Sequence, residues 1–394
     1  MNNNSPTKIL ILDACQRSAL AATRSLGAFA HLYVVTSDTV EHTLAGSSRF
    51  SEQHFTYPDP VKKPDDFVRS VARFCCSEGI SFIQPMTEIT SQLIAINHKQ
   101  FGSTIIPFSG IEIIRSIANK TSLMLLANSL SIPIPSTQYY ASLKEWDYNK
   151  ETDFPIVVKP SLSRFEHNGE WITTTVRIVK SAQELSSIIS KDNYLKYTSF
   201  MVQEYIPGHG AGIFALYRNG RRKAHFAHRR IREKPPSGGV SVLSESVAAS
   251  PTLISYADAM LEKVRWSGVA MVEFRISDEG TPYLMEINTR FWGSLQLAID
   301  SGVDFPLLTY QAFTGSTNTS GEYRVGLKLR WLLGDFDSLY LYLRDARYTK
   351  MQKFQRLAVF FTPSFNCKNE IFRLRDIQPA WHELGNYIKN IFVK

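Results

Sequence analysis

The sequence is poor in cysteine, in long apolar runs and in low-complexity segments. Its four cysteines, Cys15, Cys75, Cys76 and Cys367, show neither C-x-x-C spacing nor the spacing of a disulfide framework. No apolar run approaches the ~18 residues that span a bilayer, and residues 1–7 contain no apolar signal core. These absences argue against a small disulfide scaffold and against membrane insertion, and we expect a cytoplasmic protein with reduced thiols.

The composition is that of an ordinary globular protein with two or three domains. The chain has 394 residues, of which 44% are apolar and 20% are charged, and its formal net charge is +8. Residues 321–394 hold 13 Lys and Arg against 7 Asp and Glu, and residues 218–234 hold eight basic residues against Glu233 alone. Basic surfaces attract nucleic acid, acidic membranes or anionic ligands. A basic cluster inside a folded domain favours a small anionic ligand.

The first residues predict a Rossmann-like layer that does not bind a dinucleotide. Residues 8–13 form a continuous apolar run typical of a buried parallel strand, and a helix at 18–26 and a strand at 31–36 follow. The turn at residues 14–18 contains no glycine, so the close backbone approach to a pyrophosphate is missing. A helix at 64–78 and strands at 80–84 and 103–108 complete a first domain, residues 1–115.

The rest of the chain predicts an α+β domain and a basic extension. Residues 116–320 alternate short strands with helices, and residues 321–394 combine helical patterns with basic side chains. Asn219-Gly220 is a strong two-residue turn signal between two strands. The expected strands of the second domain are 156–159, 171–179, 200–205, 213–218, 222–228, 269–276 and 281–288. The fold class is therefore α/β with α+β.

The last strand pair of the second domain carries the most informative residues. If Glu279-Gly280 is a two-residue hairpin loop, Glu273 lies directly opposite Glu286. Like charges on directly opposite strand residues, whose Cβ atoms are about 5 Å apart, are destabilising, so a cation must offset the two carboxylates. Asn288 shares the face of Glu286 because side chains alternate along a strand. Two carboxylates and an amide oxygen form an all-oxygen set, which suits Mg²⁺.

Another interpretation of this pair is two exposed glutamates on a surface hairpin. The neighbouring residues Val269, Met271, Leu284, Met285 and Ile287 are apolar. They favour a core sheet over a surface hairpin.

Further segments become informative only as an ordered set. Lys159 closes the apolar strand 156–159, and residues 201–208 read as a strand that ends in a Pro-Gly turn. With the metal hairpin and the sequence of residues 285–290, MEINTR, they resemble the ATP-grasp superfamily, the fold of carbamoyl-phosphate synthase large chain, biotin carboxylase and D-alanine ligases. The resemblance covers about residues 8–315.

The resemblance implies an ATP site with Mg²⁺, or alternatively Mn²⁺. Glu273, Glu286 and Asn288 match the metal-binding positions, and the two glutamates also belong to the nucleotide site. The family's nucleotide lysines correspond to Lys120 and Lys159. The hinge segment that meets adenine corresponds to Gln203, Glu204, Tyr205 and Ile206.

Two departures from the family pattern affect the nucleotide site. The phosphate-covering loop at 161–169 has one glycine, so its serine hydroxyls, Ser161 and Ser163, and the side chain of Arg164 are its candidate phosphate contacts. Residues 208–212 contain no acid to bind the ribose.

By resemblance, the leading hypothesis is an ATP-dependent carboxylate–amine ligase. It would form an amide or peptide bond through an acyl phosphate and release ADP and phosphate. Arg290 would steady the transferred group, and Arg232, which shares a strand face with Arg230, would capture the acid substrate. Arg290 could equally be a structural partner of the glutamates, and the basic run around Arg232 a solvated surface.

Two rival hypotheses stay open. One is a nucleotide-binding regulatory protein that docks through its basic C-terminal region. The other is an ATP-grasp enzyme of another outcome, carboxylation or phosphorylation. We expect a small carboxylic acid and an amine, such as an amino acid or peptide, as partners. A membrane is not expected, nucleic acid is disfavoured, and a homodimer is compatible with the sequence.

Overall fold

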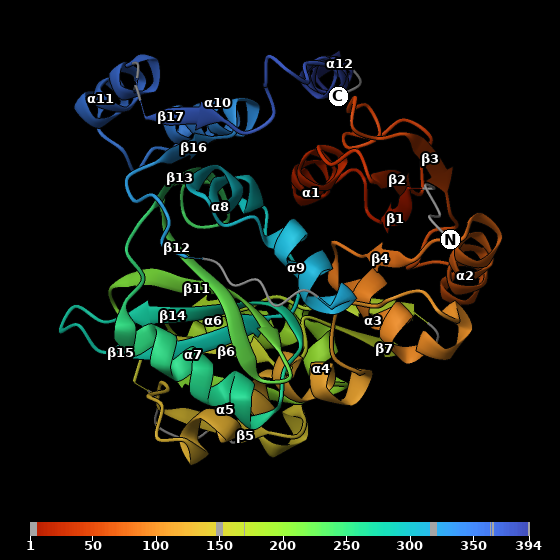
Figure 1. Ribbon diagram of the computed structural model, residues 1–394. Helices are drawn as coiled ribbons and strands as arrows, with labels where there is room; N and C mark the ends of the chain where they lie inside the picture. Colours follow the sequence, from red (N-terminus) through yellow and green to blue (C-terminus); the bar gives the residue numbers. More distant parts are fainter. Residues whose placement is uncertain are drawn as a thin grey trace.

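The computed structural model describes residues 6–146, 153–168, 170–315, 321–362, 364 and 366–392. These residues form three main sheets and a separate two-stranded hairpin, with helices packed on the sheet faces (Figure 1). No helix within these ranges is long and apolar enough to cross a membrane.

The first sheet is a parallel four-stranded layer with the strand order β3-β2-β1-β4. Successive residues of β1 face opposite sides, so Ile9 and Ile11 join one core and Leu10 joins another. Both faces are covered, which explains the continuous apolar run in the sequence. The elements of this layer are β1 (Thr7–Ile11), α1 (Arg17–Gly27), β2 (Leu32–Asp38), β3 (Gln53–Thr56), α2 (Pro64–Glu78), β4 (Phe82–Gln84) and α3 (Glu88–Ile96).

Two expected strands take a different form. Residues 103–108 contribute only one bridge, between Ile105 and Phe82. Residues 171–179 belong to two strands, β8 (Glu170–Thr173) and β9 (Arg177–Val179), which lie in different sheets. Between them Thr174 donates its N–H to the carbonyl of Ser163 at 3.0 Å. Strand periodicity shows which residues are extended, but it does not show where a strand changes partners.

The second sheet is antiparallel, with the order β5-β10-β6-β9. It has its own core, in which the rings of Trp146 and Phe200 stack 5.9 Å apart. The hairpin β7–β8 stands beside it as a separate pair. The remaining elements of this part are β5 (Thr137–Tyr140), β6 (Ile156–Pro160), β7 (Arg164–His167), α6 (Ala182–Lys191) and β10 (Phe200–Glu204).

The third sheet has seven strands in the order β15-β14-β11-β12-β13-β16-β17. One face, with Phe214 and Met271, shares a core with α1 of the first layer, and the other face, with Ile213 and Val272, packs on α5 and α7. Asn219 and Gly220 form the expected β11–β12 turn, both with positive φ.

The strands of this sheet are β11 (His209–Arg218), β12 (Arg221–Lys234), β13 (Val240–Ser246), β14 (Gly268–Ile276), β15 (Pro282–Asn288), β16 (Lys328–Arg330) and β17 (Cys367–Asn369). The helices that pack around it are α4 (Ile111–Ala118), α5 (Lys120–Ser129), α7 (Pro251–Lys263), α8 (Leu295–Ser301) and α9 (Phe305–Thr314).

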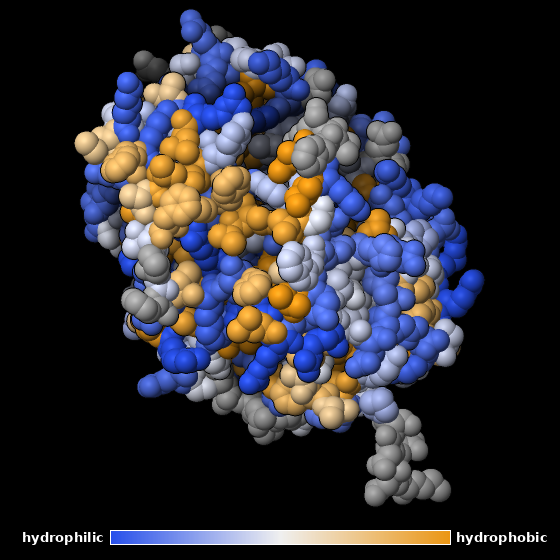
Figure 2. Space-filling view, turned by 90° about the horizontal axis from the view of Figure 1, so that it is seen from above, coloured by the Kyte–Doolittle hydropathy of each residue, from blue (hydrophilic) through white to orange (hydrophobic). Residues whose placement is uncertain are grey.

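The C-terminal extension is part of this fold rather than a separate tail. It adds β16 and β17 to the edge of the third sheet and contains α10 (Leu332–Arg344), α11 (Lys350–Phe361) and α12 (Gln378–Phe392). Figure 2, which looks down on the end of the molecule that carries these helices, shows apolar clusters among charged side chains.

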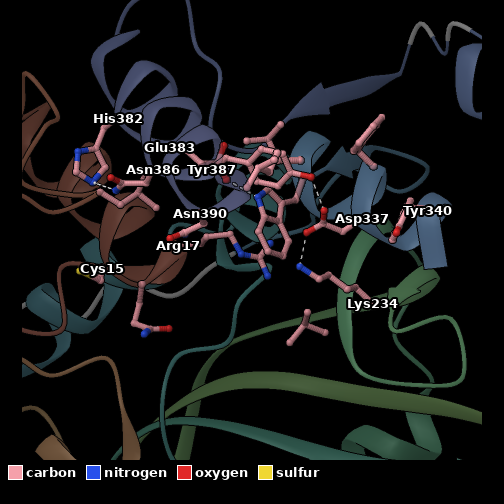
Figure 3. A pocket seen from close by; sticks show the side chains of 17 residues that line it. Cys15, Arg17, Lys234, Asp337, Tyr340, His382, Glu383, Asn386, Tyr387 and Asn390 are labelled. Carbon is pink, nitrogen blue, oxygen red and sulfur yellow. Dashed lines mark hydrogen bonds and ion pairs between the residues drawn. The ribbon is translucent and has the colours of Figure 1, made fainter. Parts of the chain in front are cut away.

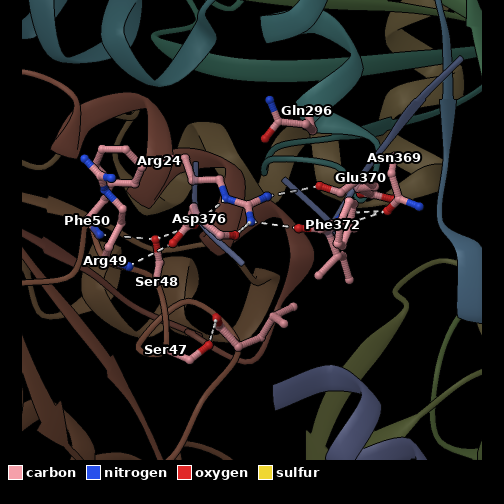
Figure 4. Close-up of polar contacts among 12 residues, drawn as sticks. Arg24, Ser47, Ser48, Arg49, Phe50, Gln296, Asn369, Glu370, Phe372 and Asp376 are labelled. Carbon is pink, nitrogen blue, oxygen red and sulfur yellow. Dashed lines mark hydrogen bonds and ion pairs between the residues drawn. The ribbon is translucent and has the colours of Figure 1, made fainter. Parts of the chain in front are cut away.

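A buried ion pair joins the extension to the first layer (Figure 4). Arg24 of α1 donates to Asp376 at 2.7 Å and to the carbonyl of Ile371 at 2.8 Å. Asp376 also accepts from the Ser48 hydroxyl at 2.8 Å and from the Arg49 N–H at 2.9 Å. The side chain of Arg24 is 9% exposed and that of Asp376 is 2% exposed.

Candidate active site

The β14–β15 hairpin places Glu273 directly opposite Glu286, as the sequence predicts. The prediction of a two-residue hairpin loop is wrong, however. Ser277 pairs with Thr281 across a three-residue loop, in which Gly280 has φ +89°. The longer loop shifts the register by one residue, and a bulge at Met285 shifts it back. Two deviations from the assumed geometry therefore cancel at the glutamates.

The two carboxylates converge on Asn288. Its amide nitrogen lies 2.9 Å from Glu286 Oε1 and 3.1 Å from Glu273 Oε1. Burial, and then the charge of Glu286, raise the pKa of Glu273. Burial acts in the same direction on Glu286, but Lys120 and the Asn288 amide outweigh it and hold that pKa below its usual value. This arrangement is a pair of acids that a cation would stabilise.

Two lysines approach the glutamates, Lys120 from α5 and Lys159 from β6 of the second sheet. Lys120 is the first residue of α5 and is 5% exposed. Its Nζ lies 3.6 Å from Glu286 Oε2 and 3.1 Å from the Ser163 hydroxyl. Asn119 caps the helix by accepting from the Ser122 N–H, which fixes where Lys120 begins the first turn.

Lys159 projects from β6 of the second sheet toward β15 of the third. Its Nζ lies 3.5 Å from the sulfur of Met285, and its side chain is buried. Burial lowers the pKa of Lys159 to about 8, although Glu286 opposes that shift. The second sheet thus contributes a buried ammonium and the third sheet contributes the carboxylates, so the two sheets enclose one polar cleft.

The segment expected to be the hinge joins these two sheets. Gln203, at the end of β10, is 1% exposed and donates to Thr137 Oγ1 at 2.9 Å. Arg275 of β14 donates to the carbonyl of Ile206 at 3.1 Å. Gly208 has φ +123°, and a Cβ there would lie 1.9 Å from the carbonyl oxygen of Ile276. Glu204 is exposed and Tyr205 is partly exposed at this connection.

Ser161 does not take the place that the resemblance implies. Its side chain is fully buried, and its hydroxyl contacts Thr121 Oγ1 at 2.7 Å and Ser199 Oγ at 2.9 Å. These contacts tie the end of β6 to α5 and leave the hydroxyl no open side. Ser163, two residues later, is the serine that meets Lys120. Sequence reasoning could not separate the two, because both stand in the same short segment.

Arg290 lines a small cavity with Lys120, Ser163, Glu286 and Asn288. Its guanidinium donates to the carbonyl of Phe291 at 3.0 Å. Glu88, the first residue of α3, lines the same cavity from the N-terminal layer. No sequence pattern pointed to Glu88, because only the packing of the first layer against β15 brings it there.

Arg232 lies outside this site, contrary to the expectation that it shares a face with Arg230. Arg230 donates to Glu273 Oε2 at 3.0 Å, whereas Arg232 donates to Asp335 at 2.6 Å. Irregular pairing of β12 with β13 on both sides of Arg232 breaks the simple alternation of side chains. Arg230 is therefore the arginine of this run that joins the candidate site.

A larger pocket of about 1060 Å³ lies between α1, α10 and α12 (Figure 3). The Arg17 guanidinium lies 4.0 Å from the centre of the Trp331 ring on one wall. Lys234, which ends β12, forms an ion pair with Asp337 on another wall. A Cβ at Gly293, three residues after Arg290, would lie 3.0 Å from Arg17 Nη2. The pocket thus borders the segment that carries Arg290.

Cys15 stands on the rim of this pocket but is not an activated nucleophile. Burial, with a further contribution from Asp38, raises the pKa of its thiol to about 12. In the part of the chain that the structure describes, no three or more His, Cys, Asp or Glu side chains gather as a metal site. The donor set at β14–β15 is therefore two carboxylates and one amide.

Comparisons with known proteins agree with this architecture. Residues 196–334 match the family model described as "ATP-grasp in the biosynthetic pathway with Ter operon". The matched range includes the hinge segment 203–206 and the predicted site residues Arg232, Glu273, Glu286, Asn288 and Arg290. No curated protein matches the chain by sequence.

Solved structures show the same fold at low sequence identity. An L-amino acid ligase from Bacillus licheniformis matches with a TM-score of 0.62 and 15% identity over 79% of this chain and 75% of that one. N5-carboxyaminoimidazole synthetase from Staphylococcus aureus, complexed with ADP, matches with a TM-score of 0.62 and 13% identity over 82% and 81%. Biotin carboxylase from Campylobacter jejuni gives 0.61 and 14% over 83% and 75%. The expected fold is confirmed.

Proposed function

We propose that this chain, which has the ATP-grasp fold, is an ATP-dependent ligase that joins a carboxylic acid to an amine. One observation carries the proposal. The two facing glutamates, Asn288 and two buried lysines meet in a single cleft between two sheets. Carboxylates opposite lysines suit a metal nucleotide, because the acids would hold a cation and the lysines would neutralise phosphate charge.

Glu273, Glu286 and Asn288 are the residues that would hold Mg²⁺ or Mn²⁺. The donor chemistry fits, since hard divalent cations take carboxylate and amide oxygens. Asn288 now donates to both acids, so its amide would turn over to offer oxygen. When bound, the metal supplies charge neutralisation at the phosphates during transfer.

Lys120 and Lys159 are assigned to the nucleotide phosphates, and residues 203–206 to the adenine. A buried ammonium offers a compact positive charge that is strengthened by its low-polarity surroundings. The Gln203 side chain is buried against Thr137, so Gln203 would contact the adenine through its backbone. Ser163 replaces Ser161 as the proposed hydroxyl contact beside Lys120.

Arg290 is assigned to the transferred phosphoryl group. The proposed reaction transfers the γ-phosphoryl of ATP to the carboxylate of the acid, which gives ADP and an acyl phosphate. The amine then attacks the acyl carbon, the carbon–oxygen bond to phosphate breaks, and inorganic phosphate leaves. A fixed guanidinium beside this centre offsets the negative charge that develops on the transferred group.

The pocket beside Arg17 and Trp331 is the proposed entry site of the acid or amine. It combines aromatic walls with ion pairs, and it borders the chain segment that follows Arg290. Polar groups placed among apolar walls are typical of small-molecule sites. An amino acid or short peptide matches this mixed lining.

The proposal is tested by measuring ADP release with purified protein, ATP and Mg²⁺ across a matrix of acids and amines, with hydroxylamine as an acyl-phosphate trap. We expect ADP release that depends on the acid, and a hydroxamate when hydroxylamine replaces the amine. Acid-independent ATP turnover would point instead to another ATP-grasp outcome. ATP binding without any turnover would favour a nucleotide-binding regulatory protein.

A further inference from the structure

A buried acid gathers three arginines at the junction of the third sheet and the C-terminal extension. Asp335 of α10 is fully buried. It accepts from Arg232 of β12 at 2.6 Å, from Arg330 of β16 at 2.7 Å and from Arg356 of α11 at 2.8 Å. Four elements from two parts of the chain therefore meet at one carboxylate.

This cluster carries more positive charge than its one acid can offset. The three arginine side chains are between 12% and 20% exposed. Burial lowers the pKa of Arg232 to about 10, although Asp335 opposes the shift. The ring of Phe360 lies 4.1 Å from the Arg330 guanidinium and covers part of it. Buried like charges are costly unless a further anion joins them.

Hydrogen-bonding capacity is also left over in this cluster. Arg232 Nε, Arg330 Nη2 and Arg356 Nη1 are buried and have no hydrogen-bond partner among the residues that the structure describes. Buried guanidinium nitrogens normally find acceptors, and charge-assisted bonds to oxyanions are among the strongest available to them. The geometry thus offers unused donors in an environment of excess positive charge.

A pocket of about 660 Å³ opens beside the cluster. Arg232 and Arg330 line it, and Lys328 and Lys368 add two further cations to its wall. These lysines are only loosely paired, Lys328 with Glu245 at 3.9 Å and Lys368 with Asp300 at 3.5 Å. The rest of the lining is largely apolar, from Ile231, Leu243, Leu332, Val359 and Phe361.

We propose that this pocket binds a small organic anion, with its carboxylate or phosphate held by Arg232 and Arg330 and its apolar part against Leu243, Val359 and Phe361. The site is separate from the nucleotide cleft, because Arg230 and not Arg232 contacts Glu273. The inference therefore goes beyond the proposed ligase activity. An anion there also links β12 to β16, and so stabilises the extension on the sheet.

The thiol of Cys367 provides a local measurement, since it lines the same pocket. The rate of its alkylation in the full-length protein is measured by peptide mass spectrometry, without ATP and at constant ionic strength set with NaCl. The probes are inorganic phosphate and hexanoate. Cys76, exposed on α2, is the internal control. By mass action, a probe at ten times its Kd slows alkylation of Cys367 about tenfold and leaves Cys76 unchanged.

Variants then assign the protection to the pocket. Arg330→Gln removes a lining cation and should abolish the protection, whereas Lys350→Gln removes an exposed charge from α11 and should preserve it. If Arg330→Gln does not fold by circular dichroism, Lys368→Gln tests the same wall without touching Asp335 and should weaken protection.

Protection by phosphate identifies a phosphate head group, and protection by hexanoate a carboxylate with an apolar body. The proposal is overturned if neither probe protects Cys367 from alkylation. It is also overturned if Lys350→Gln loses as much of this protection as Arg330→Gln. The measurement involves no nucleotide, so its failure is distinguishable from failure of the ligase hypothesis.

Discussion

Lys159 illustrates at the residue scale how a binding site is built at a cost in stability. Its ammonium is buried beside the Met285 sulfur, in surroundings that disfavour its charge. The unfolded chain holds this proton up to about pH 10.5, whereas the folded protein releases it at about pH 8. Between those values the unfolded state binds more protons, so the stability contribution of this residue increases with pH.

We therefore expect Lys159→Met to stabilise the protein at pH 7 while it abolishes ATP binding. The difference between the two pKa values of Lys159 corresponds to a gain of about 3 kcal/mol in the free energy of unfolding. Urea unfolding at pH 7 should show the gain, and at pH 10 the gain should be largely gone. A variant that is less stable than the natural protein at pH 7 would contradict this account of Lys159.

Glu286 is the residue on which the metal assignment depends. Glu286→Gln keeps the size of the side chain and removes its charge, so we expect Mg²⁺-dependent ADP release to fall about 100-fold or more. Glu279→Gln is the matched control, because Glu279 is exposed in the loop of the same hairpin and should leave turnover unchanged. Unchanged ADP release in Glu286→Gln would remove the assignment.

At the scale of elements, small irregularities in strands decide which side chains meet. The bulge at Met285 restores the register that the longer β14–β15 loop would otherwise shift. The irregular pairing of β12 accompanies a contact of Arg230 with Glu273 and of Arg232 with Asp335. In both strands a bulge of one residue changes the chemistry that the face presents.

The connection between β10 and β11 turns at Gly208, where only glycine fits without strain. Gly208→Ala should destabilise the protein by about 3 kcal/mol, because the new Cβ would meet the Ile276 carbonyl at 1.9 Å and φ is +123°. Gly280→Ala, which also has positive φ but has open space around it, should cost about 1 kcal/mol. Thermal unfolding of both variants checks this, and equal losses would show that backbone conformation alone matters at Gly208.

At the scale of the whole molecule, part of the basic charge of the extension is used inside the fold. Arg330 and Arg356 are buried against Asp335, and Arg373 donates to Asp300 at 2.6 Å. These side chains are therefore not displayed as an open basic surface. The extension also completes the third sheet, so it is an integral part of the fold.

The ion pair between Arg24 and Asp376 tests whether the extension is integral. Asp376→Asn should lower the free energy of unfolding by about 3–5 kcal/mol, because it leaves a buried arginine without its acid. Asp345→Asn, an acid that meets only its neighbour Arg347 at the surface, should have little effect. Two separate unfolding transitions, or no loss of stability in Asp376→Asn, would indicate a detachable extension.

The sequence by itself determined the fold class and the pairing of the two glutamates in the β14–β15 hairpin. Glu273, Glu286 and Asn288 could be placed together because strand alternation and pairing are local rules, and the order of Lys120, Lys159 and the hinge identified the fold. Local rules also located helices α1 and α2 and the Asn219-Gly220 turn, since caps, turn residues and periodicity are written in adjacent residues.

Only the tertiary structure decided which residues from distant segments share a site. Glu88 and Arg230 reach the cleft, Ser161 and Arg232 do not, and three arginines surround Asp335. These outcomes depend on one-residue bulges and on packing between elements, which bring together residues far apart in sequence, 43 positions for Arg230 and Glu273 and 103 for Arg232 and Asp335. Such contacts leave no periodic signal in a single chain, because each is set by the shape of the whole core.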